Sequence, residues 1–184
     1  MRDIPYGVYK FSYALSINDA IREAKEVVEV LKGRKLSYPV FYDLEWKEQR
    51  NLGPQTVEAI TVAFLNVIKR AGYDVGIYCN MDWYNNVLTS TLKTYPLWIA
   101  SYPAVDGGVI VERLRPPVGM GWQYSSKGTV PGINGKVDMD IFYVDEKESK
   151  PVEKTETKVE TKTEVKAEGG ITAKDVLDVM RSWL

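Results

Sequence analysis

Short apolar segments that read as strands alternate along this chain with longer segments that repeat apolar residues at helical spacing. The strand-like segments are residues 7–13, 38–46, 74–79, 97–101, 121–124 and 137–143. Strands that alternate with helices are the pattern of a parallel sheet joined by crossover helices. The sequence therefore predicts an α/β domain with six strands.

Two long helices are predicted between the first three strands. Residues 18–32 place apolar side chains at helical spacing, and a glycine follows as a stop signal. After a polar loop, Gly53 and Pro54 open a second helix that continues to about residue 71. A shorter helical segment is expected at residues 82–88.

Six strands fall short of the eight that close a standard β/α barrel, which typically takes about 200 to 250 residues. The chain opens almost directly into its first strand, so two further strands have no place upstream of it. Periodicity leaves two architectures open: an open sheet of another kind, or a TIM-like barrel that lacks its first strands. In the second case, residues 7–13 would form an edge that is unpaired on one side.

Two acidic residues stand at the end of the second predicted strand. Asp43 and Glu45 are spaced i and i+2, so in a strand both point to the same face with Cα atoms roughly 6.5 to 7 Å apart. Glycoside hydrolysis commonly uses two carboxyl groups, of which one holds a proton and the other stays ionised. The alternative is that both acids end a strand in solvent, and the motif alone favours that interpretation.

The composition excludes several other kinds of chemistry. The 184 residues include 24 basic and 25 acidic side chains with no cationic block in the folded part, so there is no electrostatic footprint for nucleic acid. With no histidine and one cysteine, Cys79, the usual zinc sites and Ser-His-Asp triads are excluded. We expect no metal and no cofactor.

No run of 18 apolar residues predicts a membrane span, and no basic-then-apolar leader is visible.

Five segments in order resemble successive strands of glycoside hydrolase family 25 muramidases. They are residues 6–14 (YGVYKFSYA), 40–45 (VFYDLE), 76–80 (GIYCN), 97–102 (LWIASY) and 121–126 (GWQYSS). Residues 130–140 (VPGINGKVDMD) resemble the last strand of that family with its approach loop. Together the matches cover residues 5–144. Five ordered blocks are more specific than one acidic pair, and they favour the functional interpretation of the two acids.

The resemblance implies hydrolysis of the β-1,4 bond between N-acetylmuramic acid and N-acetylglucosamine in peptidoglycan. By position it makes Glu45 the general acid and base. It makes Asp43 the carboxylate that orients the substrate N-acetyl group or acts more directly on the anomeric carbon. Asp138 matches a further acid that lines the cleft of the family, although Asp140 would face the same side of its strand.

Several side chains near the predicted strand ends are candidates for substrate binding, because β/α barrels build their sites there. These are Tyr42, Tyr78, Trp98 and Gln123. For Tyr78 and Trp98, simple packing is an equally good interpretation, whereas we expect Tyr9 and Phe11 to lie in the core. The resemblance implies peptidoglycan glycan strands as the partner, an extracellular or cell-wall location, and a monomer when complete.

The chain departs from the family at its N-terminus. The family carries a first strand of the Gly-Ile-Asp-Val-Ser type whose aspartate sits in the active site, and this chain has no equivalent. We therefore expect about six of eight barrel strands within residues 1–144. The alternative to an active muramidase is a catalytically inactive remnant that binds peptidoglycan.

The composition changes after the last predicted strand. Residues 145–170 consist mainly of Lys, Glu, Thr and Val, which predicts a disordered linker. Residues 171–184 place apolar side chains on one face of a helix and resemble the opening helix of CHAP-like modules. The alternative is a short tail helix that docks back on the barrel.

Overall fold

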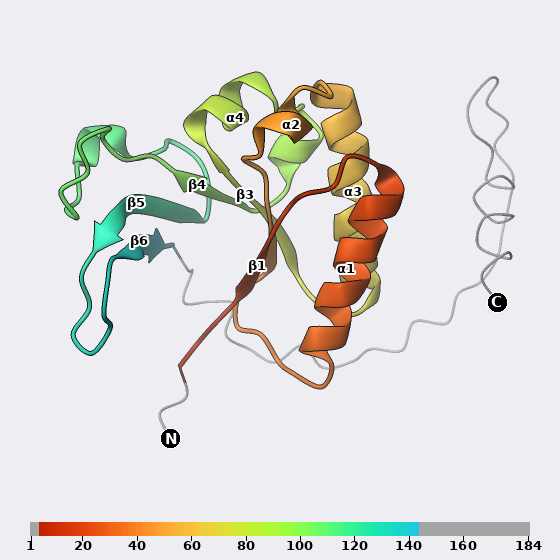
Figure 1. The fold of residues 1–184 in the computed structure, drawn as a ribbon, viewed down its shortest axis with the longest axis horizontal. Coiled ribbons are helices and arrows are strands. Elements are labelled where there is room, and N and C mark those ends of the chain that lie inside the picture. The colour runs from red at the N-terminus through yellow and green to blue at the C-terminus, as the bar shows by residue number, and fades with distance from the viewer. Residues whose placement is uncertain (1–3, 144–184) are drawn as a thin grey trace, which may run out of the picture. The chain divides into compact units, whose positions relative to one another are not determined.

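The computed structural model describes residues 4–143, which form a six-stranded sheet with helices on one face (Figure 1). The strands are β1 (Val8–Phe11), β2 (Val40–Asp43), β3 (Val75–Asn80), β4 (Leu97–Ala100), β5 (Gly121–Gly128) and β6 (Val137–Phe142). The α-helices are α1 (Ile17–Leu31), α2 (Lys47–Arg50), α3 (Pro54–Arg70) and α4 (Met81–Asn86), with 3-10 turns at Leu92–Thr94 and Glu112–Leu114. The predicted α/β class and the six strands are confirmed.

The strands lie in chain order, and the first five are parallel. Strand β6 departs from the parallel pattern, because it runs antiparallel to β5 with two irregularities in register. Only a short loop joins β5 to β6, and a parallel pair would need a crossover connection of a dozen or more residues. The last two strands therefore form a hairpin.

The sheet curls into a half-barrel. The ring of Tyr38, which precedes β2, lies 5.2 Å from the ring of Phe142 at the end of β6, measured between centroids. This contact brings the last strand across the concave face toward the start of the second. A partial barrel of about six strands, rather than a flat open sheet, is the architecture observed.

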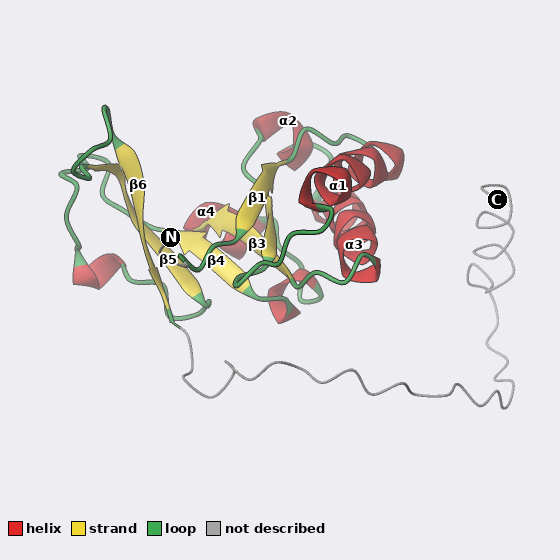
Figure 2. Cartoon of the chain, turned by 90° about the horizontal axis from the view of Figure 1, so that it is seen from below, coloured by secondary structure: helices red, strands yellow, loops and turns green. Residues whose placement is uncertain are grey.

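Helices α1 and α3 pack against each other on the convex face of the sheet (Figure 2). Each buries an apolar stripe at helical spacing: Ala20, Ala24 and Leu31 from α1, and Val57, Ile60, Phe64, Leu65 and Ile68 from α3. Ser16 caps α1 by accepting a hydrogen bond from the Asp19 N–H. Gly53 adopts a positive φ of 81° just before Pro54 starts α3, a backbone angle that few other residues tolerate.

Alternation along β2 separates the core from the concave face. Val40 and Tyr42 point to the helices, and Tyr42 stacks on Phe64 with ring centroids 3.8 Å apart. Phe41 belongs to a second apolar cluster with Tyr78 and neighbouring rings. Successive strand residues point to opposite faces, so Asp43 follows Phe41 onto the concave side.

Two local expectations were wrong. The predicted strand at residues 38–46 ends at Asp43, so Glu45 lies beyond it. The segment that follows, expected as a polar loop, contains the short helix α2. Tyr9, expected in the core, is 61% exposed, and Phe11 is only partly buried. Both lie on β1, at the edge of the sheet, where no described strand covers the concave face.

The remaining domain predictions are not tested by the described residues. Residues 4–143 fall within the predicted catalytic barrel of residues 1–144, whereas the predicted linker at 145–170 and the helix at 171–184 lie outside them. In the described range, none of the helices combines the length and apolar character that crossing a bilayer requires.

Among residues 4–143, the outer edge of β1 carries backbone groups that pair with no other strand. Tyr6 O accepts from Tyr38 N, and Ser12 N donates to Asp43 O, so even-numbered residues of this segment face β2. By alternation, the backbone N–H and C=O groups of Tyr9 and Phe11 face away from β2. Edge strands of this kind are templates for pairing with another chain.

We predict that Tyr9→Lys reduces the concentration-dependent self-association of the chain, because a charge on an edge strand opposes edge-to-edge pairing. Sedimentation velocity over a range of protein concentrations measures the effect. The control is Val30→Lys, which changes an exposed apolar residue of α1 away from the sheet. Equal effects of the two variants would show that the β1 edge has no special role.

Candidate active site

Three carboxyl groups gather at one end of the concave face. Asp43 is the last residue of β2 and is only 5% exposed. Glu45 lies two residues further on and is open to solvent. Asp138, the second residue of β6, is also exposed. The curl of the sheet is what brings a residue of β6 near the end of β2.

The three carboxyl groups interact electrostatically. Burial raises the pKa of Asp43 to about 8, and the negative charges of Glu45 and Asp138 add to the rise. The pKa of Glu45 is also raised, first by partial burial and then by Asp138. Asp43 Oδ1 is buried and has no hydrogen-bond partner among the described residues. Burial and the neighbouring negative charges both favour the protonated forms of Asp43 and Glu45.

Tyr78 and Gln123 form a fixed polar pair beside the acids. The Tyr78 hydroxyl donates to Gln123 Oε1 at 2.7 Å, and both side chains are buried. Burial raises the pKa of Tyr78, followed by the charges of Glu45 and Asp43. Because the Gln123 oxygen accepts this bond, its amide N–H groups are the ones available to a ligand hydroxyl or carbonyl oxygen.

Trp98 connects the aromatic rings of the concave face to a fourth acid, Asp140. Its indole Nε1 donates to Asp140 Oδ1 at 2.9 Å, and its ring meets the Tyr78 ring edge-on at 4.7 Å. Burial raises the pKa of Asp140 to about 6, against the lowering effect of the Trp98 hydrogen bond and with a further rise from Asp138. Asp138 and Asp140 therefore both lie at the site, but Asp140 is engaged by Trp98 and Asp138 is the more exposed.

Tyr42 does not belong to the site, which corrects its prediction as a substrate-binding residue. Its side chain is fully buried on the convex face, where the hydroxyl donates to Glu23 Oε2 at 2.7 Å. A residue adjacent to Asp43 in a strand points to the opposite face. The alternation that pairs Asp43 with Glu45 already excluded Tyr42 from the same cleft.

No sequence motif pointed to Asp106, which shapes the loop after β4. Asp106 accepts hydrogen bonds from the N–H groups of Gly108 and Ser126 and from the hydroxyl of Ser125. Burial alone would raise its pKa, but these bonds outweigh burial and lower the pKa to about 2. They hold the loop that begins with Tyr102 against β5, close after Gln123.

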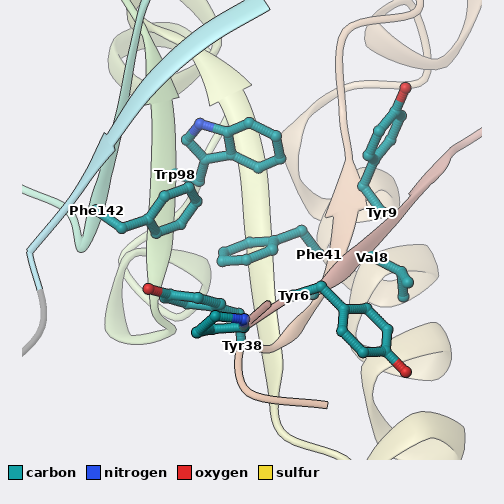
Figure 3. A pocket seen from close by; sticks show the side chains of 9 residues that line it. Tyr6, Val8, Tyr9, Tyr38, Phe41, Trp98 and Phe142 are labelled. Atoms are coloured by element: carbon teal, nitrogen blue, oxygen red, sulfur yellow. The ribbon is translucent and has the colours of Figure 1, made fainter. Parts of the chain in front are cut away.

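A separate apolar pocket of about 270 Å³ occupies the other end of the concave face (Figure 3). Its lining residues are Pro5, Tyr6, Gly7, Val8, Tyr9, Tyr38, Phe41, Trp98 and Phe142. None of these is acidic, and Trp98 is the residue shared with the acid cluster. The pocket therefore offers mainly apolar contact, and the acids lie outside its lining.

No ready metal site accompanies the acids: within residues 4–143, no three His, Cys, Asp or Glu side chains are grouped so as to hold an ion. What the described arrangement offers is proton transfer and charge stabilisation by carboxyl groups of unlike exposure.

The raised pKa of Asp43 predicts a pH-dependent stability. A carboxyl with an ordinary pKa near 3.9 when unfolded and about 8 when folded stabilises the fold fully below about pH 4. That stabilisation, on the order of a few kcal/mol, is lost as the pH rises toward 8. Asp43→Asn should therefore lose less stability than the wild type between pH 5 and pH 9, as measured by denaturant unfolding. Asp74→Asn, at an exposed position, is the control; identical pH dependence in all three proteins would contradict the prediction.

Several known proteins are similar to this chain in sequence or in structure. An autolytic lysozyme of Clostridium acetobutylicum is 32% identical over 139 residues, which are 72% of this chain and 38% of the relative. The autolysin LytC of Streptococcus pneumoniae, solved with a synthetic peptidoglycan ligand, is 28% identical with a TM-score of 0.63 and is matched over 76% of this chain and 34% of its own. The catalytic domain of the endolysin ply40, from a bacteriophage of Listeria monocytogenes, is 26% identical with a TM-score of 0.61.

That last match covers 76% of this chain and 68% of the endolysin domain. The chain thus spans well under half the length of the autolytic lysozyme and of the pneumococcal autolysin. The sequence pattern of glycosyl hydrolases family 25 matches residues 1–133, well over half of the chain. The chain belongs to glycosyl hydrolases family 25.

Proposed function

We propose that this chain carries a muramidase site that hydrolyses the β-1,4 bond between N-acetylmuramic acid and N-acetylglucosamine in peptidoglycan. The observation that supports this most directly is the coupled group of Asp43, Glu45 and Asp138 at one end of an aromatic concave face. Membership of the family and similarity to an autolytic lysozyme point to the same substrate class.

Glu45 is the proposed general acid and base. It is open to solvent, so its carboxyl can reach the oxygen of a bound glycosidic bond and later a water molecule. Its raised pKa favours retention of the proton that the leaving group needs. A catalytic acid works best when its pKa lies near the operating pH.

Asp43 is the proposed stabilising carboxylate. In the free chain its pKa of about 8 keeps it protonated near neutrality. Positive charge that develops on the sugar would favour its ionised form, with the proton released to solvent, because an opposite charge nearby lowers the pKa of a carboxyl. Asp43 then either orients the substrate N-acetyl group or acts directly on the anomeric carbon, while Asp138 lines the cleft.

The glycan is proposed to lie along the side chains that border the acids. Trp98 and Tyr78 offer ring faces and edges for sugar contact, and the amide of Gln123 offers a donor for a hydroxyl or acetamido oxygen. A cell-wall or extracellular place of action and a monomeric state follow from this proposal as expectations.

A second candidate is binding of peptidoglycan without turnover. The unpaired edge of β1 favours it, because the concave face beside Tyr9 is not closed by any described strand. A site that retains its aromatic contacts but is open to bulk water would bind sugars better than it polarises their bonds.

We predict that Glu45→Gln lowers the release of reducing ends from purified peptidoglycan by about 10² to 10⁴ fold, the usual contribution of general acid catalysis. Glycan binding should persist, because the amide keeps the shape of the side chain. Asp43→Asn should also be severe, since it removes the charge that stabilises the anomeric centre. Glu48→Gln, at an exposed position on α2, is the matched control.

Mass spectrometry of the products assigns the cleaved bond through the sugar at the new reducing end. Near-normal turnover by Glu45→Gln would contradict its proton-transfer role. Sedimentation with insoluble peptidoglycan measures binding separately, so a wild-type chain that binds without releasing reducing ends would favour the second candidate.

A further inference from the structure

One buried hydroxyl joins the two ends of the segment that carries the acids. Ser12 Oγ donates to the Tyr42 hydroxyl at 2.7 Å and accepts from Gln49 Nε2 at 2.7 Å. Tyr42 immediately precedes Asp43, and Gln49 follows Glu45 by four residues. We propose that Gln49 is a positioning residue that fixes the Asp43–Glu45 segment through Ser12.

The backbone of the same segment is tied on both sides. Ser12 N donates to Asp43 O at 3.0 Å, and Leu44 N donates to Tyr78 O at 2.9 Å. Beyond Leu44 the chain leaves the sheet, so Glu45 has no ladder partner to fix it. Its position depends on what holds the segment that follows.

That segment is α2, a helix of four residues. So short a helix does not form on its own, because nucleation is costly, and no side chain caps it at Trp46. Gln49 is its buried residue, and Nε2 also donates to Ala14 O at 2.9 Å. A second attachment of α2, between Arg50 and Asp82, is an exposed ion pair of the kind that contributes little.

The partner of the Ser12 hydroxyl, Tyr42, is itself fixed by a further hydrogen bond. The Tyr42 hydroxyl donates a hydrogen bond to Glu23 Oε2 at 2.7 Å, and Glu23 Oε1 accepts from Tyr13 N at 2.8 Å. Ser12, Glu23 and Gln49 are all buried. The network therefore connects the segment just after β1 with α1, β2 and α2, and it satisfies hydroxyl and amide groups that burial would otherwise leave unpaired.

One atom of the network argues against a purely stabilising role. Gln49 Oε1 is buried without a hydrogen-bond partner among the described residues, an arrangement that costs stability. An apolar side chain of similar size would avoid that cost. What the amide provides instead is a directed bond from α2 to Ser12, so that Glu45 is held at a fixed distance from Asp43.

The catalytic consequence rests on the proposed muramidase function, but the positioning itself does not. If Gln49 sets the location of the acids, then Gln49→Leu should loosen the segment and admit water to Asp43. The titration of the Asp43 and Glu45 carboxyl carbons, followed by NMR in selectively labelled chain, should move toward ordinary values. The kcat on peptidoglycan should fall by about ten- to a hundredfold, with KM within about twofold, because small misplacements of catalytic groups have effects of that size.

Two further variants separate positioning from general stabilisation. Ser12→Ala removes the shared hydroxyl and should reproduce the titration change, so it also carries the test if Gln49→Leu folds poorly. Tyr73→Phe removes hydrogen bonds to Leu31 O and Arg34 O at the far ends of α1 and α3, and should lower stability without changing either titration.

Carboxyl titrations that stay at wild-type values in both Gln49→Leu and Ser12→Ala would overturn the proposal. A titration change of equal size in Tyr73→Phe would overturn it as well. Because the NMR readout needs no turnover, a wild-type chain that fails to cleave peptidoglycan would contradict the proposed function while leaving this test intact.

Discussion

The site depends on the burial of one carboxyl group at the end of β2. Asp43 points to the concave face because Tyr42 beside it stacks on Phe64 in the helix layer, and the pleat of a strand permits no other arrangement. Packing on one face of the sheet thus determines the chemistry on the other. The cost of burying Asp43 without a hydrogen-bond partner appears as its raised pKa.

The curl of the sheet supplies the rest of the site. Asp138 belongs to β6, more than ninety positions after Asp43, and it affects both Asp43 and Glu45 only because the sheet bends back on itself. The aromatic contacts of Phe41, Trp98 and Phe142 fill the inside of this bend. Apolar packing within the half-barrel and coupling between its acids are therefore two results of one curvature.

Much of this was predictable from local pattern, and the failures have identifiable causes. The strands and the two long helices follow from apolar periodicity, which tertiary packing only reinforces. The antiparallel direction of β6 was missed because it depends on the length of the loop that precedes this strand. The helix α2 was missed because it depends on a single buried residue, Gln49. Tyr9 was misplaced because the burial of an edge residue depends on what lies beside it. Tyr42 was misassigned although strand alternation, applied consistently, excluded it.

In the proposed site, Asp43, Glu45 and Asp138 form one electrostatic unit. The most direct measurement is the NMR titration of the Asp43 and Glu45 carboxyl groups in the Asp138→Asn variant, compared with the wild type. Loss of the Asp138 charge removes a cause of both raised pKa values, so both should fall, while burial keeps that of Asp43 above its ordinary value. Unchanged titration of both groups would show that Asp138 lies outside the site and would contradict the account.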